Sequence, residues 1–338
     1  MNAETDYHNI RAWLGHCQRP LLVGHDRPDG DALGAIAGMS LLLGQIGLDP
    51  LPVLFGPMLP RYTMLQGLVP WKRWDLEHAH LADAGDALII IDTCSWTQLE
   101  PIAAYLDKAP RTLVLDHHAT YDAIGTRPDD LRLVDGTAGA VCLLVAEWAR
   151  TAGLKLTAPI ATALFAGLAT DCGWFRFPNT DARLLRVAAD LVEAGAASDA
   201  IYSSLYEQDP PAKQRLVGRM LHPLELHADG RLAVLTLRDA DFTAAGADRT
   251  MTEDLVNEAR RLAGTESTLL LTEEPDGRVR ANFRSKETLD VAALARQFGG
   301  GGHPRAAGAR PNGTWDEVVP RVIAATVAAL RETTDSPE

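Results

Sequence analysis

The sequence has few cysteines and no hydrophobic run long enough for a membrane. Its 338 residues include four cysteines, Cys17, Cys94, Cys142 and Cys172, and no two of them form a Cys-x-x-Cys pair. This scarcity favours small buried thiols over a zinc site or a redox motif. Apolar runs such as 87–91 are far too short to span a bilayer, and the first 20 residues lack the basic start and long apolar stretch of a signal peptide. We therefore expect a cytoplasmic protein without a membrane segment.

Positive charge is also scarce. The 45 acidic residues outnumber the 32 basic ones and give a formal net charge of −13. This balance argues against an extended surface that follows the phosphates of a long duplex, but it leaves room for a short nucleotide held by a few cations. A hydrophobic content of 46% and the lack of low-complexity segments indicate a globular chain. Its length predicts two domains.

The first half of the chain alternates strand-like and helix-like segments. Residues 20–24, 87–91 and 112–115 are apolar runs, typical of strands buried on both faces of a sheet. Helices are expected at 31–46, 137–152 and 159–169. The alternation predicts an α/β catalytic domain over 1–195, with a mostly parallel sheet and helices on both of its faces. Ligands of such folds gather beyond the carboxyl ends of the strands.

The pattern changes after residue 195. Residues 196–212 indicate a linker, and a second, smaller α/β domain is expected over 213–338. Turns rich in glycine, proline and aspartate separate its short strands, which are expected at 224–227, 232–237, 267–272 and 278–283. Helices are expected at 212–221, 252–262, 290–298 and 315–330.

Acidic and imidazole side chains follow the apolar segments of the first half. They are His25, Asp29, Asp31, Asp92, Asp116, His117, His118 and Asp171. Five aspartates and three histidines in one place would repel one another or be poorly solvated unless cations lay between them, and two metal ions need about this many ligands. Oxygen and imidazole ligands without thiolate favour Mn²⁺, with Mg²⁺ or Co²⁺ as alternatives. Taken alone, the segment 25–31 also fits an ordinary turn in which Asp31 caps a helix.

Two further motifs have more than one interpretation. The glycines 299–302 before His303 fit a helix C-cap and a flexible loop, but four glycines exceed what a cap needs. They would also let backbone N–H groups approach a phosphate, and Arg284 would add a bidentate clamp. The aromatic residues that follow Asp171 either stack a nucleobase or pack in a core or an interface. They are Trp174, Phe175 and Phe177.

The order of these motifs resembles that of the DHH phosphoesterases, in the branch that carries a DHHA1 domain. The resemblance runs from His25 to Gly308, and its most specific parts are Asp116-His117-His118 and the segment 299–308. The two-domain length is similar to that of the nanoRNase and pAp phosphatase subgroup, where pAp is 3′-phosphoadenosine 5′-phosphate. This resemblance implies a DHH domain with two Mn²⁺ ions, followed by a DHHA1 domain that binds substrate.

The resemblance also implies a role for each residue. One ion would be held by His25 and Asp29, and the other by Asp31, His117 and Asp171. Asp92 would bridge the two ions. Asp116 would support the ligands and His118 would face the scissile phosphate, which makes these two the catalytic residues. The substrate's phosphate or nucleotide end would be held by Arg284, Ser285, Gly301, Gly302 and His303.

The implied reaction is hydrolysis of short single-stranded oligoribonucleotides to mononucleotides, and of pAp to AMP, by a water activated between two metal ions. Alternatives are a phosphodiesterase for pApA or cyclic di-AMP and an exonuclease for short single-stranded DNA or RNA. A manganese pyrophosphatase would lack the glycine–histidine run, and a nucleotide sensor would usually have lost metal ligands. No membrane and no long duplex is expected as a partner, and a homodimer is compatible with the sequence.

Overall fold

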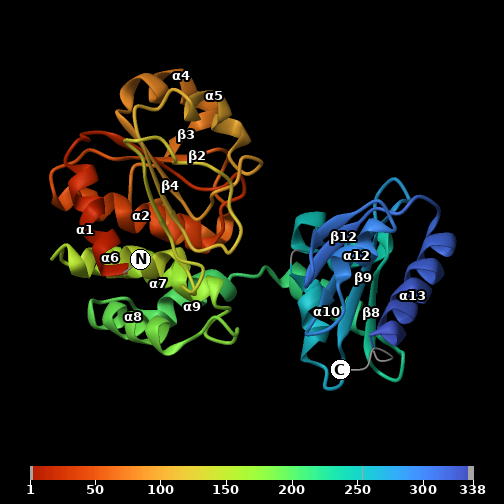
Figure 1. Ribbon diagram of the computed structural model, residues 1–338. Helices are drawn as coiled ribbons and strands as arrows, with labels where there is room; N and C mark the ends of the chain where they lie inside the picture. The colour runs from red at the N-terminus through yellow and green to blue at the C-terminus, as the bar shows by residue number, and fades with distance from the viewer. Residues whose placement is uncertain (1–2, 253, 334–338) are drawn as a thin grey trace. The chain divides into compact units, whose positions relative to one another are not determined.

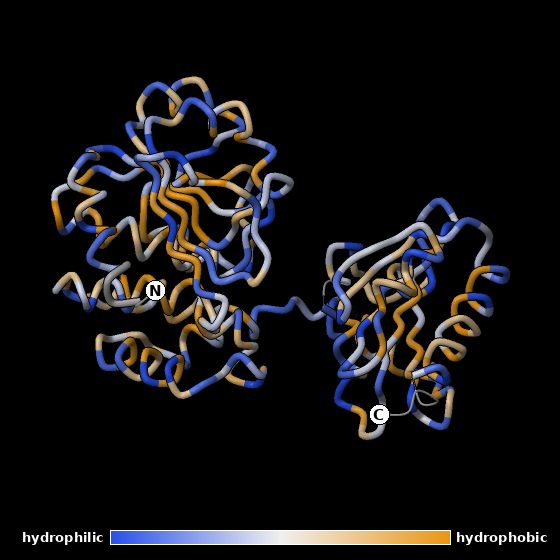
Figure 2. Tube along the Cα trace, viewed as in Figure 1, coloured by the Kyte–Doolittle hydropathy of each residue, from blue (hydrophilic) through white to orange (hydrophobic). Residues whose placement is uncertain are grey.

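Each half of the chain folds around its own six-stranded sheet (Figure 1). The structure, a computed structural model, describes residues 3–252 and 254–333, and it divides the chain into the units Met1–Gln208 and Asp209–Glu338. Figure 2 shows the most apolar segments along the strands of both sheets. Within the described ranges, no helix has both the length and the apolar character needed to cross a bilayer. The α/β fold class predicted from the sequence is confirmed.

The first sheet is entirely parallel, with the order β3-β2-β1-β4-β5-β6. The strand order changes direction between β1 and β4, and ligands of such sheets bind beyond the carboxyl ends of the strands at this switch point. Both His25 and Asp92 follow these two strands directly or nearly so. The strands are β1 Pro20–Val23, β2 Leu51–Leu54, β3 Lys72–Arg73, β4 Ala87–Ile91, β5 Thr112–Asp116 and β6 Leu131–Val134.

Helices cover both faces of this sheet, because alternate residues of each buried strand point to opposite sides. In β4, Ile89 and Ile91 pack with α1, α2, α6, α7 and α8, whereas Leu88 and Ile90 pack with α4 and α5. The helices are α1 Ala3–Leu14, α2 Gly30–Gln45, α3 Thr63–Gln66, α4 Trp74–Ala84, α5 Ala103–Leu106, α6 Val141–Thr151, α7 Ala158–Asp171, α8 Ala182–Glu193 and α9 Ser198–Tyr206. The short 3₁₀ helices are η1 Pro60–Tyr62 and η2 Glu100–Ile102.

The helices α2 and α7 pack unusually closely because glycines lie at their contact. A Cβ atom on Gly34 would lie 2.4 Å from the carbonyl oxygen of Ala163. A Cβ atom on Gly167 would lie 2.4 Å from the Sγ atom of Cys142 and 2.8 Å from the carbonyl oxygen of Gly30. These separations are well inside van der Waals contact, so any larger residue would push the helices apart. The contact brings the first turn of α2 beside the last turn of α7.

The helix α9 lies within the segment 196–212 that the sequence indicated as a linker. Its Ile201 and Leu205 are buried in the same apolar cluster as α6, α7 and α8. The sequence shows no clear helical periodicity here, because only two of the nine residues of α9 face the core. The segment 198–206 is therefore part of the first unit.

The second sheet is mixed, with the order β11-β12-β10-β9-β8-β7, and only β8 and β9 pair in parallel. The helices α12 and α13 cover one face and α10, α11 and η4 the other. The strands are β7 Glu225–His227, β8 Leu232–Leu237, β9 Ser267–Glu273, β10 Val279–Ser285, β11 Gly301–His303 and β12 Ala306–Ala309. The helices are α10 Pro211–Leu221, α11 Asp239–Ala245, α12 Val291–Arg296 and α13 Trp315–Glu332, with 3₁₀ helices η3 Arg249–Thr252 and η4 Leu255–Arg261.

Two expectations for the second unit are corrected. The helix expected over 252–262 is interrupted, because Asp254 adopts φ 65° and the chain continues as the 3₁₀ helix η4. The glycine run is not a loop throughout, because Gly301–His303 forms an edge strand that pairs with β12. The close approach of these two strands requires glycine at two positions. A Cβ atom would lie 2.1 Å from the carbonyl oxygen of Gly308 at residue 300, and 2.5 Å from that of Ala306 at residue 302.

Candidate functional site

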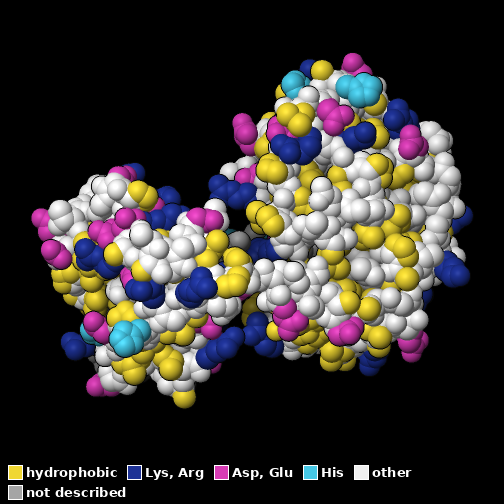
Figure 3. All heavy atoms as spheres, turned by 180° about the vertical axis from the view of Figure 1, so that it is seen from behind, with side chains coloured by type: hydrophobic (Ala, Val, Ile, Leu, Met, Phe, Trp, Pro, Cys, Tyr) yellow, Lys and Arg dark blue, Asp and Glu magenta, His cyan; other side chains and the backbone are white. Residues whose placement is uncertain are grey.

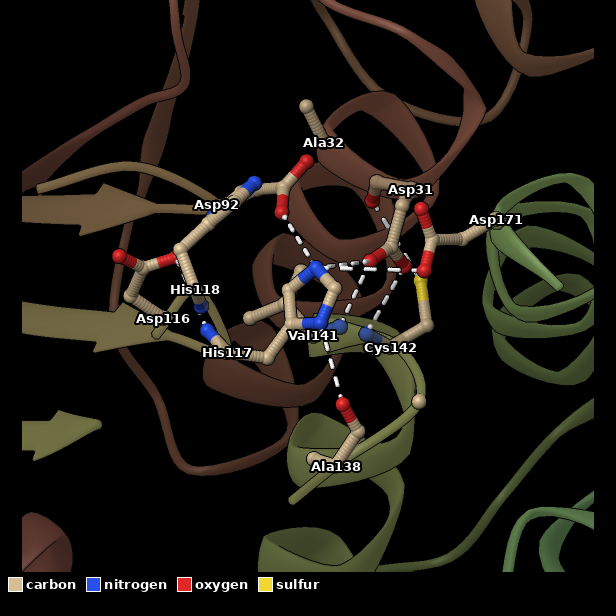
Figure 4. A network of polar contacts seen from close by, with 12 residues as sticks. Asp31, Ala32, Asp92, Asp116, His117, His118, Ala138, Val141, Cys142 and Asp171 are labelled. Carbon is tan, nitrogen blue, oxygen red and sulfur yellow. Dashed lines mark hydrogen bonds and ion pairs between the residues drawn. The ribbon is translucent and has the colours of Figure 1, made fainter. Parts of the chain in front are cut away.

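The acidic and imidazole side chains of the first unit converge beyond the carboxyl ends of β1, β4 and β5 (Figure 4). Three sets of potential ligand atoms each lie within 4.8 Å of one another. They are His25 with Asp29 and Asp92, Asp31 with His117 and Asp171, and Asp92 with His117 and His118. Asp92 and His117 each belong to two sets, so the three sets form one continuous site.

His117 is oriented by the backbone of a neighbouring loop. Its Nδ1 lies 3.1 Å from the carbonyl oxygen of Ala138, so Nδ1–H donates there and Nε2 faces the carboxylates. Nε2 lies 3.3 Å from Asp92 Oδ1, 3.7 Å from Asp31 Oδ2 and 4.0 Å from Asp171 Oδ2. Burial opposes a charge on this ring, but the contact with Asp92 and the charges of Asp31 and Asp171 outweigh burial and raise the pKa of His117 to about 10. The acidic groups around the His117 ring therefore favour a positive charge at this position.

Asp92 lies at the centre of the site and is 3% exposed. Its backbone has φ 65°, a left-handed conformation that aspartate and asparagine tolerate better than most residues, and its N–H donates to Leu115 O at 2.9 Å. Its Oδ1 accepts no hydrogen bond from any described residue. Burial and the charge of Asp31 raise the pKa of Asp92 well above its usual value. His25 lies on its other side, with Nε2 3.7 Å from Asp92 Oδ2.

Asp31 is held at the start of another helix. Its two carboxylate oxygens accept the N–H groups of Val141 at 2.6 Å and Cys142 at 3.0 Å, which open α6. These N–H donors and the positive end of α6 stabilise a carboxylate that is only 1% exposed. Even so, burial and the charge of Asp29 raise the pKa of Asp31. By contrast, Asp29 caps the helix α2 through the N–H groups of residues 31 and 32, so the two aspartates point to different partners.

Asp171 ends α7 and is tethered by Asn179. The Nδ2 atom of Asn179 donates to Asp171 Oδ2 at 3.3 Å and to Gly139 O at 2.9 Å. Burial and the charge of Asp31 raise the pKa of Asp171 to about 7. A carboxylate at a helix C-terminus is disfavoured by the helix dipole, and the charges of His117 and His118 act in the opposite direction.

Asp116 and His118 form a separate pair at the end of β5. Asp116 is fully buried, and its Oδ1 accepts the N–H groups of both histidines and the Nδ1–H of His118 at 2.7 Å. The side chain of His118 is half exposed. The hydrogen bond from Asp116 raises the pKa of His118. Asp116 therefore orients His118 and leaves its Nε2 atom available to a ligand.

The sequence pattern did not identify four residues that support the site. They are Ala138, Val141, Cys142 and Asn179. Three of them act through backbone groups, which any residue carries, so no side-chain pattern marks them. Asn179 offered a weak signal as a polar residue eight positions after Asp171, but only the fold shows that it reaches back.

The donor atoms of the site fit divalent metal ions. All of them are carboxylate oxygens or imidazole nitrogens, and the buried Asp92 Oδ1 lacks a hydrogen-bond donor among the described residues. A buried carboxylate oxygen without a donor is costly unless a cation satisfies it. The raised pKa values of Asp31, Asp92 and Asp171 also indicate a metal site, because a cation would relieve the repulsion between these carboxylates.

The second unit carries a basic cavity of about 440 Å³ on the face of β10 that packs against η4. Arginine side chains dominate its polar lining, together with Asn282; they are Arg249, Arg280 and Arg284. Burial lowers the pKa of Arg284, Asp254 opposes this effect, and the nearby Arg260 and Arg280 add to it. An anion in the cavity would balance these charges.

The other residues expected to hold substrate lie around the edge strand β11. Gly301 and His303 are exposed. A Cβ atom on Gly301 would meet nothing within 4 Å, so neither packing nor backbone conformation explains the glycine there. Ser285 differs from the expectation of a substrate contact, because it is 1% exposed and its Oγ donates to Leu289 O at 2.7 Å. Its hydroxyl supports the loop between β10 and α12 and does not face a ligand.

The chain is similar to known proteins over most of its length. The chain is 29% identical to the bifunctional oligoribonuclease and PAP phosphatase NrnA of Thermus thermophilus, over 89% of this chain and 87% of the relative. It is also 29% identical to the NrnA protein of Bacillus subtilis, over 88% of this chain and 90% of the relative. An exopolyphosphatase-related protein from Bacteroides fragilis has the same fold, with a TM-score of 0.85 at 19% identity over 97% of this chain and 96% of that chain.

Two family models match the chain, and each match falls within one unit. Residues 20–168 match the DHH family N-terminal domain, and residues 229–332 match the DHHA1 domain. Together these ranges cover well over half of the chain, and the first contains the Asp116-His117-His118 motif. The chain therefore belongs to the DHH–DHHA1 family of phosphoesterases.

Proposed function

We propose that this protein is a manganese-dependent phosphoesterase that hydrolyses short oligoribonucleotides to mononucleotides and pAp to AMP. The observation that carries the proposal is the sharing of Asp92 and His117 between sets of ligand atoms, which suits two adjacent metal ions. The names of the two NrnA relatives supply the substrate class. Oxygen and imidazole donors without thiolate favour Mn²⁺, with Mg²⁺ or Co²⁺ as substitutes.

The proposed division of ligands follows two of the three sets, the one with His25 and the one with Asp171. His25 and Asp29 would hold one ion, Asp92 would bridge both, and the second ion would be held by Asp31, His117 and Asp171. A water of lowered pKa is the nucleophile that such a centre supplies near neutral pH. The hydrogen bond that His117 donates to Ala138 O, and the one that Asp31 accepts from the α6 N-terminus, keep these two proposed ligands in place before substrate arrives.

His118 is proposed to act on the phosphate itself. Its Nδ1–H is committed to Asp116, so Nε2 is the atom that faces the substrate. Because Asp116 raises the pKa of this ring, the imidazolium is favoured, and it would donate a proton to the leaving oxygen or a hydrogen bond to the phosphoryl group. The removal of either member of the pair would lower kcat.

The second unit is proposed to bind the substrate end that is not attacked. Arg284 in the basic cavity, with Gly301, Gly302 and His303, would hold a phosphate or nucleotide, and Ser285 would act indirectly by supporting the adjacent backbone. On the face in Figure 3, Lys and Arg side chains are scattered among acidic and apolar ones. With a net charge of −13, this distribution supports a short substrate better than a long strand. The cytoplasmic location and a homodimer remain predictions from the sequence.

The test is a substrate panel with purified protein and Mn²⁺. It contains pAp, pApA, cyclic di-AMP, pyrophosphate and labelled RNA and DNA single strands of increasing length. We expect mononucleotide release from short RNA and phosphate release from pAp. Turnover of pApA or cyclic di-AMP alone would favour the phosphodiesterase alternative, and a value of kcat/KM that rises steadily with strand length would favour a processive exonuclease.

A further inference from the structure

An aromatic cluster lies on the first unit beside the metal ligands. It consists of Trp174, Tyr202 and Tyr206 and is called the aromatic platform below. The ring centroid of Trp174 lies 5.0 Å from that of Tyr202 and 5.8 Å from that of Tyr206, and the two tyrosine rings lie 5.1 Å apart. Tyr202 and Tyr206 are 39% and 45% exposed, one turn apart on α9. Two adjacent aromatic rings thus remain open to solvent while a third supports them.

The backbone that carries Trp174 is strained. Gly173, Trp174 and Phe175 adopt φ values of 58°, 58° and 64° in succession. The left-handed conformation is costly for bulky residues, and such strain clusters at functional sites. Phe165 and Phe175 pack against Trp174 from α7 and from the loop itself, at centroid distances of 5.9 and 6.2 Å. The loop is therefore built to hold the Trp174 ring in one position.

The platform adjoins the metal site on two sides. Trp174 follows Asp171 by three residues, and its N–H donates to Ala169 O at 2.6 Å, which folds the loop back onto the end of α7. On the other side, α9 packs against η1, which ends at Tyr62. Burial raises the pKa of Tyr62 to about 12; the charge of Arg61 opposes this effect, and the charges of Asp29 and Tyr206 add to it.

The same loop offers a cation. Arg176 is exposed, and its Nε donates to Gly173 O at 2.7 Å, which ties the guanidinium to the loop that carries Trp174. Its side chain forms no ion pair with an acidic group in the described ranges, and its guanidinium carbon lies 5.9 Å from the ring centroid of Phe177. Exposed rings and a guanidinium without an acidic partner among the described residues, on the loop that carries Trp174, match the two parts of a nucleotide, the base and the phosphate.

We propose that Tyr202 and Tyr206, supported by Trp174, stack the nucleobase of the nucleotide whose phosphate is hydrolysed. The inference rests on the proposed function and adds a base-binding subsite on the catalytic unit. Stacking is tolerant of base identity because every base has a π-face, so the subsite would favour nucleotides over base-free phosphoesters without selecting one sequence.

The test compares two substrates that differ only in the base. They are pAp and ribose 3′,5′-bisphosphate, and phosphate release is measured with Mn²⁺. We expect wild-type kcat/KM to be about 10-fold or more higher for pAp, in the range of a single base–aromatic stack. Tyr202→Ala and Tyr206→Ala should each lose about 10-fold on pAp and little on the base-free compound, and the corresponding Phe variants should retain activity on pAp. Leu76→Ala removes a 72% exposed apolar side chain from α4 and serves as the control.

Three outcomes would overturn the inference. They are equal losses on both substrates in the Ala variants, the absence of a wild-type preference for pAp, and a lower melting temperature in the Ala variants with the substrate preference unchanged. The last would show that the rings serve packing only. These outcomes leave the proposed function intact as long as pAp is hydrolysed, whereas a lack of activity on both pAp and RNA would remove the proposed function itself.

Discussion

The substitution Asp92→Asn should stabilise the metal-free protein while it abolishes activity. Asp92 is 3% exposed, and burial together with Asp31 raises the pKa of its carboxyl well above the usual value. Because the folded-state pKa lies above the unfolded one, folding is penalised at neutral pH, by about 1.4 kcal/mol for each pKa unit. Asparagine carries no charge and also tolerates φ 65°, so it removes the penalty without adding the backbone strain that alanine would bring.

The expected size of the effect is measurable. For each pKa unit, the gain of about 1.4 kcal/mol corresponds to a melting temperature higher by about 3 to 6 °C in a unit of this length. In the wild type, Mn²⁺ at about 100 times its Kd should add about 2.7 kcal/mol, and the Asn variant should lose most of that gain because the proposed bridge is gone. Activity on pAp should fall by about 1,000-fold or more, since Asp92 is the carboxylate proposed to hold both ions.

Differential scanning calorimetry in EDTA tests the expected rise in melting temperature, and the same measurement with Mn²⁺ tests the expected loss of metal stabilisation. Asp83→Asn is the matched control, because Asp83 is exposed on α4 and lies away from the site. It should leave the metal-free melting temperature and the Mn²⁺ response unchanged. A melting temperature of Asp92→Asn below that of the wild type in EDTA, together with the full Mn²⁺ response, would show that the carboxylate is neither penalised nor a ligand.

Further predictions concern affinity, substrate length and pH. Arg284→Ala and His303→Ala should raise KM for short RNA with a smaller effect on kcat, and steady-state kinetics that show equal kcat losses with unchanged KM would contradict a binding role. Plots of kcat/KM against RNA length should peak at about two to five residues. The pKa of Asp171 is raised to about 7, so the carboxyl is partly protonated below neutral pH in the metal-free protein; calorimetry should show Mn²⁺ affinity rising from pH 6 to 8 with proton release. Burial opposes ionisation of Glu266, but the N–H groups of residues 287–289 outweigh it and lower its pKa. Its stabilisation is therefore present above about pH 4.3 and lost as pH falls, so urea unfolding should show Glu266→Gln to be weaker than wild type at pH 7 and closer to it near pH 3.

The amino-acid pattern alone predicts β1, β4 and β5, which are three of the six strands of the first sheet, together with the residues proposed as metal ligands. Buried parallel strands are continuous apolar runs, so the pattern predicts Ala87–Ile91 with its observed bounds, and the polar residues after such runs lie at one edge of the sheet. This is why the residue pattern alone assigns Asp92 and His117 to one site. The helix α9 was not predicted, because few of its residues face the core and the periodic signal is weak. The helix predicted over 252–262 differs in type and start, because the left-handed Asp254 interrupts it and the 3₁₀ helix η4 follows.

The contacts that orient the proposed metal-binding side chains could be seen only in the tertiary structure. The helix α6 supplies N–H groups to Asp31 across 110 residues of sequence, and the loop before α6 orients His117 through a carbonyl oxygen. The tertiary structure also showed that the hydroxyl of Ser285 is committed to the backbone. These interactions depend on backbone groups that every residue shares, and on the close contact of α2 with α7 at Gly34 and Gly167. Residue identity records which atoms can bind a metal, whereas their mutual distances follow from packing between segments far apart in the chain.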